Sequence, residues 1–198
     1  MKIKLSNITN LSDARFAAAA GIDYIGFCFD KTNSNYIQPF KAKEIIDWTS
    51  GIKVVAEFTN QNLEEINTIC KLLQVDLLEI ENDFTVDELA QFEIPIIKKI
   101  NISSLDEVAF INEIELYKNS VYAFQLYSNQ TSENIKEKYF GLENKMIWGN
   151  DVNANNIKNI VDEYRPYAIN ISSDVEEKIG LKNFDELNEL LEIVSSQN

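Results

Sequence analysis

Short apolar runs recur along the chain about every 24 residues, with stretches of helical periodicity between them. The first run, Lys2–Ser6, places Ile3 and Leu5 on one face and Lys4 and Ser6 on the other, which is the period of a β-strand. We therefore expect a polar inner face and an apolar outer face that packs on helices. Strands are predicted at Lys2–Ser6, Asp23–Phe29, Ile52–Phe58, Asp76–Glu81, Pro95–Ile100, Val121–Leu126, Lys145–Trp148 and Tyr167–Ile171.

Residue types that begin helices stand before several of the intervening segments. Asn10 precedes a strong helix former, Asp13 to Ala20, and Gly21 closes it. Pro39 suits the first turn of the next helix. Later helix starts are predicted by four pairs at capping-box spacing, namely Asn62/Glu65, Thr85/Glu88, Ser104/Glu107 and Asn183/Glu186.

Eight strands alternating with helices predict an α/β fold, a single-domain (β/α)8 TIM barrel over residues 1–198. The alternative is a doubly wound open sheet, which usually carries a glycine-rich fingerprint after its first strand. The turn at residues 6–9 reads Ser-Asn-Ile-Thr and has no glycine. In both folds the chemistry lies at the carboxyl ends of the strands, where Ser6 stands.

Composition narrows the function further. The net charge of −14 disfavours nucleic acid and anionic membranes as partners, and no apolar run is long enough to span a bilayer. Because the start of the chain lacks the apolar core of a secretory signal, we expect a cytoplasmic protein. The chain has no histidine, which removes the usual general base at neutral pH. Cys28 and Cys70 show no metal-ligand spacing and are expected to be free, buried thiols.

Acidic side chains near predicted strand ends have two interpretations. Glu57, Glu79, Glu81, Asp151 and Asp174 either converge at the barrel mouth and hold a cation, or are separate solvated charges. Because the alternation of the strands cannot turn all five inward, the pattern favours the second interpretation. We predict no metal and no cofactor.

Lysines within the strands also have two interpretations. Lys4 and either Lys98 or Lys99 lie in predicted strands, so one of them can face the interior. An interior lysine is either a Schiff-base former or the partner of an interior carboxylate, and we favour the ion pair.

Five segments together carry a resemblance to a known family. Residues 4–9 read Lys-Leu-Ser-Asn-Ile-Thr against its Lys-Ile-Cys-Gly-Ile-Thr, and residues 19–29 resemble its second-strand signature. Residues 33–37 fall at its Ser-Pro-Arg-Tyr-Val, residues 165–176 resemble Arg-Pro-x-x-Val-Asp-Val-Ser-Ser-Gly-Val-Glu, and residues 180–183 follow like Gly-x-Lys-Asp. The chain thus resembles the phosphoribosylanthranilate isomerase family. The resemblance implies a TIM barrel and an Amadori rearrangement of a phosphorylated aminosugar in tryptophan biosynthesis.

The two catalytic positions of that family are altered. The resemblance places Ser6 at the cysteine that acts as general base and Tyr127 at the aspartate that acts as general acid. A serine hydroxyl is too weakly acidic to replace the base unaided, and a phenol titrates near ~10. Ser6 and Tyr127 are therefore either a remodelled acid–base pair or side chains that fill a vacated cavity, and we favour the second.

The substrate-binding positions depart as well. Asn35 stands where the family has the arginine that pairs with the anthranilate carboxylate, and the Gly-Gly-Thr-Gly phosphate loop is missing from residues 130–141. Asp151 and Asp174 bring negative charge toward the phosphate position. Besides Asn35, the substrate-binding positions implied by the resemblance are Glu79, Glu81, Gly149, Asn150, Ser172 and Ser173.

The sequence thus predicts an isomerase-like barrel that has lost the isomerase activity and is retained for ligand or protein binding. The alternative is an active phosphoribosylanthranilate isomerase, or a related isomerase or lyase with a remodelled site that uses Glu79, Glu81 or Lys4. We expect a small polar ligand or a protein partner, and a monomer or weak homodimer.

Overall fold

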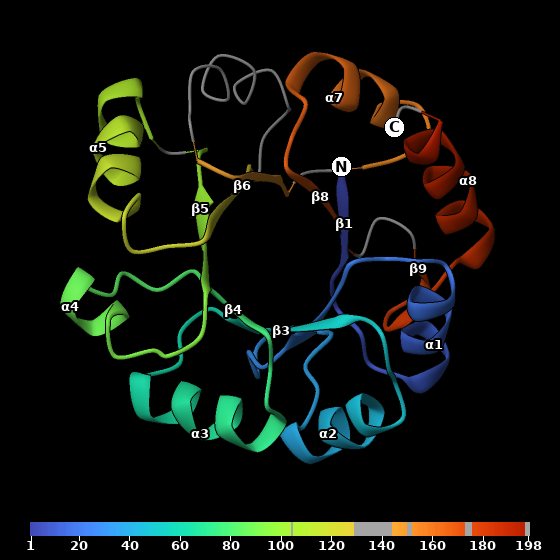
Figure 1. Cartoon of the computed structure of the whole chain (residues 1–198), viewed down its shortest axis with the longest axis horizontal. Coiled ribbons are helices and arrows are strands. Elements are labelled where there is room, and N and C mark those ends of the chain that lie inside the picture. Colours follow the sequence, from blue (N-terminus) through green and yellow to red (C-terminus); the bar gives the residue numbers. More distant parts are fainter. Residues whose placement is uncertain (104, 129–143, 150–151, 173–175, 197–198) are drawn as a thin grey trace.

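The computed structural model describes residues 1–103, 105–128, 144–149, 152–172 and 176–196. Eight parallel strands form a closed barrel in chain order, and the first strand pairs with the eighth, with Lys2 opposite Ala168 (Figure 1). The predicted barrel is confirmed, and its strands are β1 (Lys2–Leu5), β2 (Tyr24–Cys28), β3 (Lys53–Phe58), β4 (Leu77–Ile80), β5 (Ile96–Asn101), β6 (Ala123–Tyr127), β7 (Met146–Trp148) and β8 (Ala168–Ile171).

Helices cover the outside of the ring, as Figure 1 shows. Those in the described part of the chain are α1 (Leu11–Ala19), α2 (Pro39–Asp47), α3 (Leu63–Leu73), α4 (Val86–Leu89), α5 (Glu107–Tyr117), α7 (Ile157–Tyr164) and α8 (Phe184–Ser195). The caps predicted at Asn10, Asn62, Thr85 and Asn183 all accept hydrogen bonds from the first turn of their helices. The prediction of a helix start at the Ser104/Glu107 pair is wrong. Asp106 caps α5 instead, because its carboxylate accepts from the Ala109 amide at 2.8 Å.

The strand alternation separates two layers of side chains. Ile3 and Leu5 face outward into the main apolar cluster between strands and helices, whereas Lys4 and Ser6 are buried on the inner side, as predicted. A second apolar cluster fills the amino end of the barrel and consists of Tyr24, Val55, Leu77, Ile97, Ala123, Ile147 and Ala168. The interior therefore has an apolar floor, and its polar residues lie above it toward the carboxyl ends.

An antiparallel hairpin that the sequence did not predict follows the eighth strand. It consists of β9 (Glu176–Lys178) and β10 (Leu181–Lys182), joined through Gly180 at a φ of 75°. The Thr9 hydroxyl donates to the Gly180 carbonyl at 2.8 Å, which ties the hairpin to the loop after β1. A Cβ at position 180 would lie 2.6 Å from the Thr9 hydroxyl oxygen. Both the positive φ and this close contact therefore favour glycine at the turn.

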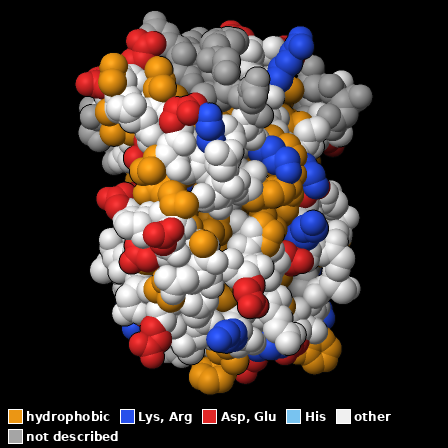
Figure 2. Space-filling view, turned by 60° about the vertical axis from the view of Figure 1, so that its left-hand side comes forward, with side chains coloured by type: hydrophobic (Ala, Val, Ile, Leu, Met, Phe, Trp, Pro, Cys, Tyr) orange, Lys and Arg blue, Asp and Glu red, His pale blue; other side chains and the backbone are white. Residues whose placement is uncertain are grey.

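The outer surface of α4 and α5 mixes apolar and charged side chains. Val108, Ile111 and Leu116 of α5 are exposed, and so is Val86 of α4. Figure 2, which brings the side of the barrel on the left of Figure 1 forward, shows apolar side chains interspersed with acidic and basic ones. No helix in the described part of the chain is long and apolar enough to cross a membrane.

Three phenols meet beneath the apolar floor. The Tyr167 hydroxyl lies 2.6 Å from that of Tyr122 and 3.3 Å from that of Tyr24, and the Lys145 ammonium lies 3.7 Å from the Tyr122 ring centroid. Each tyrosine stands at or just before the start of a strand, so the hydroxyl cluster joins β2, β6 and β8 at the barrel bottom.

Tyr167→Phe removes the hydroxyl shared by both hydrogen bonds and leaves the ring in place. We expect the free energy of unfolding in urea to fall by about 1–2 kcal/mol, because one or two partly buried hydrogen bonds are lost. Tyr24→Phe, which leaves the shorter 2.6 Å bond in place, should cost less. Equal costs for the two variants would contradict the central place of Tyr167.

Candidate functional site

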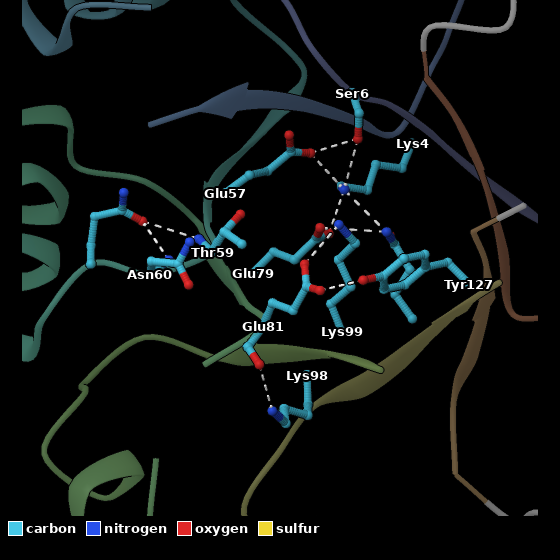
Figure 3. Close-up of polar contacts among 12 residues, drawn as sticks. Lys4, Ser6, Glu57, Thr59, Asn60, Glu79, Glu81, Lys98, Lys99 and Tyr127 are labelled. Atoms are coloured by element: carbon cyan, nitrogen blue, oxygen red, sulfur yellow. Dashed lines mark hydrogen bonds and ion pairs between the residues drawn. The ribbon is translucent and has the colours of Figure 1, made fainter. Parts of the chain in front are cut away.

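A buried lysine organises the carboxyl-terminal half of the barrel interior. The Lys4 ammonium lies 2.6 Å from Glu57 Oε1 and forms a short ion pair with Glu79 (Figure 3). It also donates to Ser6 Oγ at 2.9 Å and to Gln125 Oε1 at 3.4 Å. The predicted pairing of an interior lysine with a carboxylate is confirmed at Lys4, and Lys4 joins residues of β3, β4 and β6 to β1 and the turn after it.

The charges of this cluster shift one another's titration. Burial lowers the pKa of Lys4, but Glu57 and Glu79 outweigh it, and the net pKa is raised. Burial likewise raises the pKa of Glu57, yet the adjacent Lys4 brings it below its usual range. For Glu79, burial and the nearby Glu57 charge prevail over Lys4, so its pKa is raised. Lys4 is therefore a cation, and Glu57 is its principal counterion.

Ser6 is fully engaged by this cluster. Its hydroxyl oxygen lies 2.5 Å from Glu57 Oε1 and 2.6 Å from Asn170 Oδ1, and it accepts from Lys4. A hydroxyl has one proton, so Ser6 donates to one of the two oxygens only. The raised pKa of Lys4 keeps it protonated, and the lowered pKa of Glu57 makes its carboxylate a weak base, so neither is a strong activating base for Ser6.

A second group of charges lies nearer the mouth. The Tyr127 hydroxyl donates to Glu81, and the Lys99 ammonium lies 3.1 Å from Glu81 Oε2 and 4.5 Å from the Tyr127 ring centroid. Burial and the Glu81 carboxylate raise the pKa of Tyr127, which makes this phenol a weaker acid than a free one. Burial lowers the pKa of Lys99, but Glu79 and Glu81 reverse the shift and raise it.

Lys98 points to the opposite side of β5 and fixes the end of β4. Its buried ammonium donates to the backbone carbonyls of Glu81 and Asn82, at 3.0 and 2.8 Å. Burial lowers its pKa, and Asp83 opposes that shift from 3.7 Å. Lys98 thus holds the backbone that presents Glu81 to Tyr127.

The interior groups open into one hollow of about 200 Å³ at the carboxyl ends of the strands. Of the predicted site residues, the structure brings Ser6, Glu79, Tyr127, Gly149 and Ser172 together around it. Ser6, Tyr127, Gly149 and Ser172 therefore lie around one hollow at the carboxyl ends of their strands. The other lining residues in the described part of the chain are Asn7, Cys28, Asn33, Glu57, Phe58, Thr59, Lys99, Gln125 and Asn170.

Gln125 and Asn170 were not predicted as site residues. Each stands two positions before a predicted one, Tyr127 on β6 and Ser172 after β8. Because side chains two apart in a strand share a face, that spacing was the available sequence signal. Polar residues in otherwise apolar strands strengthen it.

Asn35 lies away from the hollow's lining, in the loop between β2 and α2. It is buried, and its Nδ2 donates to Glu176 Oε1 at 3.5 Å. Glu176 in turn accepts from the Lys182 ammonium at 2.8 Å, and Lys182 also donates to the Ser172 carbonyl. Asn35 therefore faces a carboxylate. The predicted positions Asn150 and Ser173, like Asp151 and Asp174, lie outside the described residues.

Gly149 cannot serve an anion through its own amide. Its N–H donates to the Leu126 carbonyl at 2.9 Å, which is a bond between β6 and the end of β7. A Cβ at this position would lie 2.7 Å from that carbonyl oxygen and 2.9 Å from Gln125 Cγ. The glycine is thus required by close packing against β6.

Cys28 and Cys70 are free and buried, as predicted. Burial, with a smaller contribution from Glu57, raises the pKa of the Cys28 thiol to about 11, and burial raises that of Cys70 to about 12. Both are protonated at neutral pH. Within the described part of the chain no cluster of three or more acidic or cysteine side chains is arranged to hold a metal ion. The expectation of separate solvated charges is wrong for Glu57 and Glu79, which are buried, and these two and Glu81 pair with Lys4 and Lys99.

Comparison with known proteins identifies the family. The model of the N-(5'-phosphoribosyl)anthranilate (PRA) isomerase family matches residues 3–193. The chain belongs to this family. It is 27% identical to the PRA isomerase of Sulfurihydrogenibium sp. over the whole of both chains. It is 31% identical to that of Chlorobium chlorochromatii over 92% of this chain and 91% of that one.

Solved PRA isomerase structures share the fold. The Thermus thermophilus structure superposes with a TM-score of 0.86 at 21% identity over all of both chains. A PRA isomerase in complex with reduced 1-(o-carboxyphenylamino)-1-deoxyribulose 5-phosphate has the same TM-score at 22% identity, with 99% of each chain covered. Within this family the present chain has Ser6 and Tyr127 at the two positions that the sequence resemblance marks as catalytic.

The two buried glutamates should respond to pH in opposite ways. The folded pKa of Glu57 is lowered, so its stabilisation is complete above the unfolded pKa of about 4.5 and is lost as pH falls through the folded pKa. Glu57→Gln should therefore lower the free energy of unfolding by about 1–3 kcal/mol at pH 7 and by less in acid.

The folded pKa of Glu79 is raised, so its contribution to stability is lost as pH rises through that pKa. Glu79→Gln should gain stability relative to the wild type as pH rises, and urea unfolding from about pH 2 to pH 8 measures both trends.

Gly26 makes room for Glu57. A Cβ on residue 26 would overlap Glu57 Oε1 and lie 2.6 Å from its carboxyl carbon. We expect Gly26→Ala to cost about 1–3 kcal/mol, and clearly less in a Glu57→Ala background, where Lys4 keeps Glu79 as its partner. A double-mutant cycle in urea measures the coupling, and strictly additive costs would contradict the steric explanation.

Proposed function

We propose that this PRA isomerase family member does not catalyse the isomerisation and is retained to bind a small polar ligand at the carboxyl ends of its strands. One observation carries the proposal: both catalytic-position hydroxyls are held by carboxylates, Ser6 by Glu57 and Tyr127 by Glu81. The raised pKa of Tyr127 makes it a weak acid, and the lowered pKa of Glu57 makes the carboxylate beside Ser6 a weak base. Acid–base catalysis requires both roles, and both are altered together.

Binding of the family's substrate is also disfavoured. The name of the compound in the solved complex contains a carboxyphenyl group and a phosphate, and both are anionic. In this chain the arginine position is Asn35, which faces Glu176, and the Gly149 amide is engaged within the barrel. A dianionic phosphate needs amides and positive charge that are directed at it. These features support loss of binding along with loss of chemistry.

A working isomerase is the competing function, and one observation favours it. Glu57 lies 2.5 Å from Ser6 Oγ, so a carboxylate stands beside the position of the family's base. Its lowered pKa and its ion pair with Lys4 make it a weak base.

The same proposal includes the location and the partners of the protein. We propose a cytoplasmic monomer or weak homodimer that binds neither nucleic acid nor membranes, and a protein partner is the alternative to a small ligand.

Turnover of phosphoribosylanthranilate by the purified chain should be undetectable. General acid–base catalysis contributes about 10²–10⁴ for each positioned group, and two groups are altered. A fluorescence assay of substrate consumption measures this, beside complementation of a tryptophan auxotroph that lacks the isomerase. A known PRA isomerase is the positive control. Growth supported by the unmodified chain would refute the proposal, and loss of that growth in Glu57→Gln would then identify the base.

Ser6→Cys combined with Tyr127→Asp should not restore turnover. The two substitutions return the family's residue types but leave Asn35 and the missing phosphate loop, so the substrate is still not positioned. The double variant is tested in the same assay and strain. Restoration of growth would show that binding had survived and that only the acid and the base were lost.

A further inference from the structure

The hollow among the interior polar residues is small and mostly polar. Its volume of about 200 Å³ is below the ~300–1,000 Å³ of typical ligand pockets. Such pockets are mostly apolar with a few polar groups, and here the proportions are reversed. Eleven of its lining residues in the described part of the chain carry polar side chains other than a thiol, including Ser6, Gln125 and Asn170. A ligand that fits must present hydrogen-bonding groups on nearly all sides.

The charges around the hollow are all paired, although two lysines are shared among three glutamates. Lys4 is paired with Glu57 at 2.6 Å and with Glu79, and Lys99 is paired with Glu81 at 3.1 Å. A charged ligand would have to break one of these pairs, of which those of Lys4 are buried and that of Lys99 is partly exposed, and would leave a charge without its partner. In the described lining every lysine and glutamate has a partner of opposite charge, so the site favours a neutral ligand.

Gln125 is the side chain best placed to recognise such a ligand. It is buried, and both of its hydrogen bonds are long: Nε2 donates to Glu79 at 3.4 Å, and Oε1 accepts from Lys4 at 3.4 Å. An amide offers a donor and an acceptor side by side, which matches a pair of neighbouring hydroxyls. Tyr127 adds an aromatic face at the same hollow, next to Lys99.

We propose that the hollow binds a neutral polyhydroxylated molecule of pentose size, a free sugar or sugar alcohol without phosphate. The inference rests on the proposed function, because it specifies the ligand class of the same site. At about 30 Å³ for each water, the hollow has the volume of six or seven waters, which is comparable to a five-carbon sugar. Sugar hydroxyls donate hydrogen bonds to carboxylate and amide oxygens and accept them from amide and ammonium N–H groups. A ligand of this kind therefore needs no charge of its own.

Thermal unfolding and calorimetric titration of the full chain test the inference. The probes are ribose, xylose and ribitol, with ribose 5-phosphate and anthranilate as anionic comparisons, up to about 20 mM because so small a ligand binds weakly. At least one neutral probe should raise Tm and bind tenfold or more tightly than ribose 5-phosphate. Tighter binding of ribose 5-phosphate, or no binding by any neutral probe, would overturn the inference.

The matched variants are Gln125→Leu and the exposed Gln91→Leu. Gln125→Leu should weaken the bound neutral probe about tenfold, since two hydrogen-bonding groups are lost, and Gln91→Leu should not change it. Equal affinity in both variants would place the ligand elsewhere and overturn the assignment. Should Gln125→Leu not fold, the wild-type comparison of ribose with ribose 5-phosphate still decides. The isomerase assay is independent: turnover there defeats the proposed function, whereas absent sugar binding without turnover defeats this inference alone.

Discussion

A lysine ammonium in the middle of the barrel is the constraint on which the interior depends. Removing a charge from water costs several kcal/mol, so Lys4 is tolerable only with counterions at contact distance. Glu57 and Glu79 supply them from two neighbouring strands, and Gly26 leaves the space that Glu57 occupies. Two carboxylates around one ammonium leave an excess of negative charge, which Lys99 reduces and the raised pKa of Glu79 reflects. The polar interior is therefore one coupled unit.

That unit rests on an apolar floor. Below Lys4, side chains such as Val55, Leu77 and Ile97 close the barrel, and the phenol cluster of Tyr167 closes it from outside. The floor excludes water from the side opposite to the mouth, so the ion pairs are solvated from one direction only. Stability and chemistry are thus separated along the barrel axis, as is usual for this fold.

Much of the fold could be predicted from the sequence because the same local patterns, a two-residue period in strands and caps before helices, repeat along the chain. The two-residue period around Ile3 and Leu5 predicted which face is inside, and the caps at Asn62 and Thr85 marked helix starts correctly. The start of α5 was misplaced because Ser104 and Glu107 match the capping-box spacing, while Asp106 satisfies the same amide requirement two residues later. The hairpin after the eighth strand was not predicted because it is held by a contact with residue 9, which is far away in the sequence.

The candidate site was less predictable for the same physical reason. Sequence placed Ser6 and Tyr127 at strand ends, but not which carboxylate each would contact, since that depends on the register between strands. Glu79 on β4 and Glu81 just after its end lie two residues apart, yet they pair with different lysines, because Lys4 comes from a deeper level than Lys99. Asn35 is separated from Glu176 by most of the chain, so their contact could not be inferred locally.

The residues around the altered positions are suited to one another, so we expect a single reversion to be opposed by its neighbours. A cysteine base must ionise, and a thiolate at position 6 would lie beside the Glu57 carboxylate. The neighbouring thiol of Cys28 shows the result, because burial and then Glu57 raise its pKa to about 11. A general base needs a pKa near the working pH, so Glu57 opposes the thiolate that the isomerase reaction requires. Removing Glu57 would in turn leave Lys4 to Glu79 alone. The serine and the glutamate are therefore mutually suited.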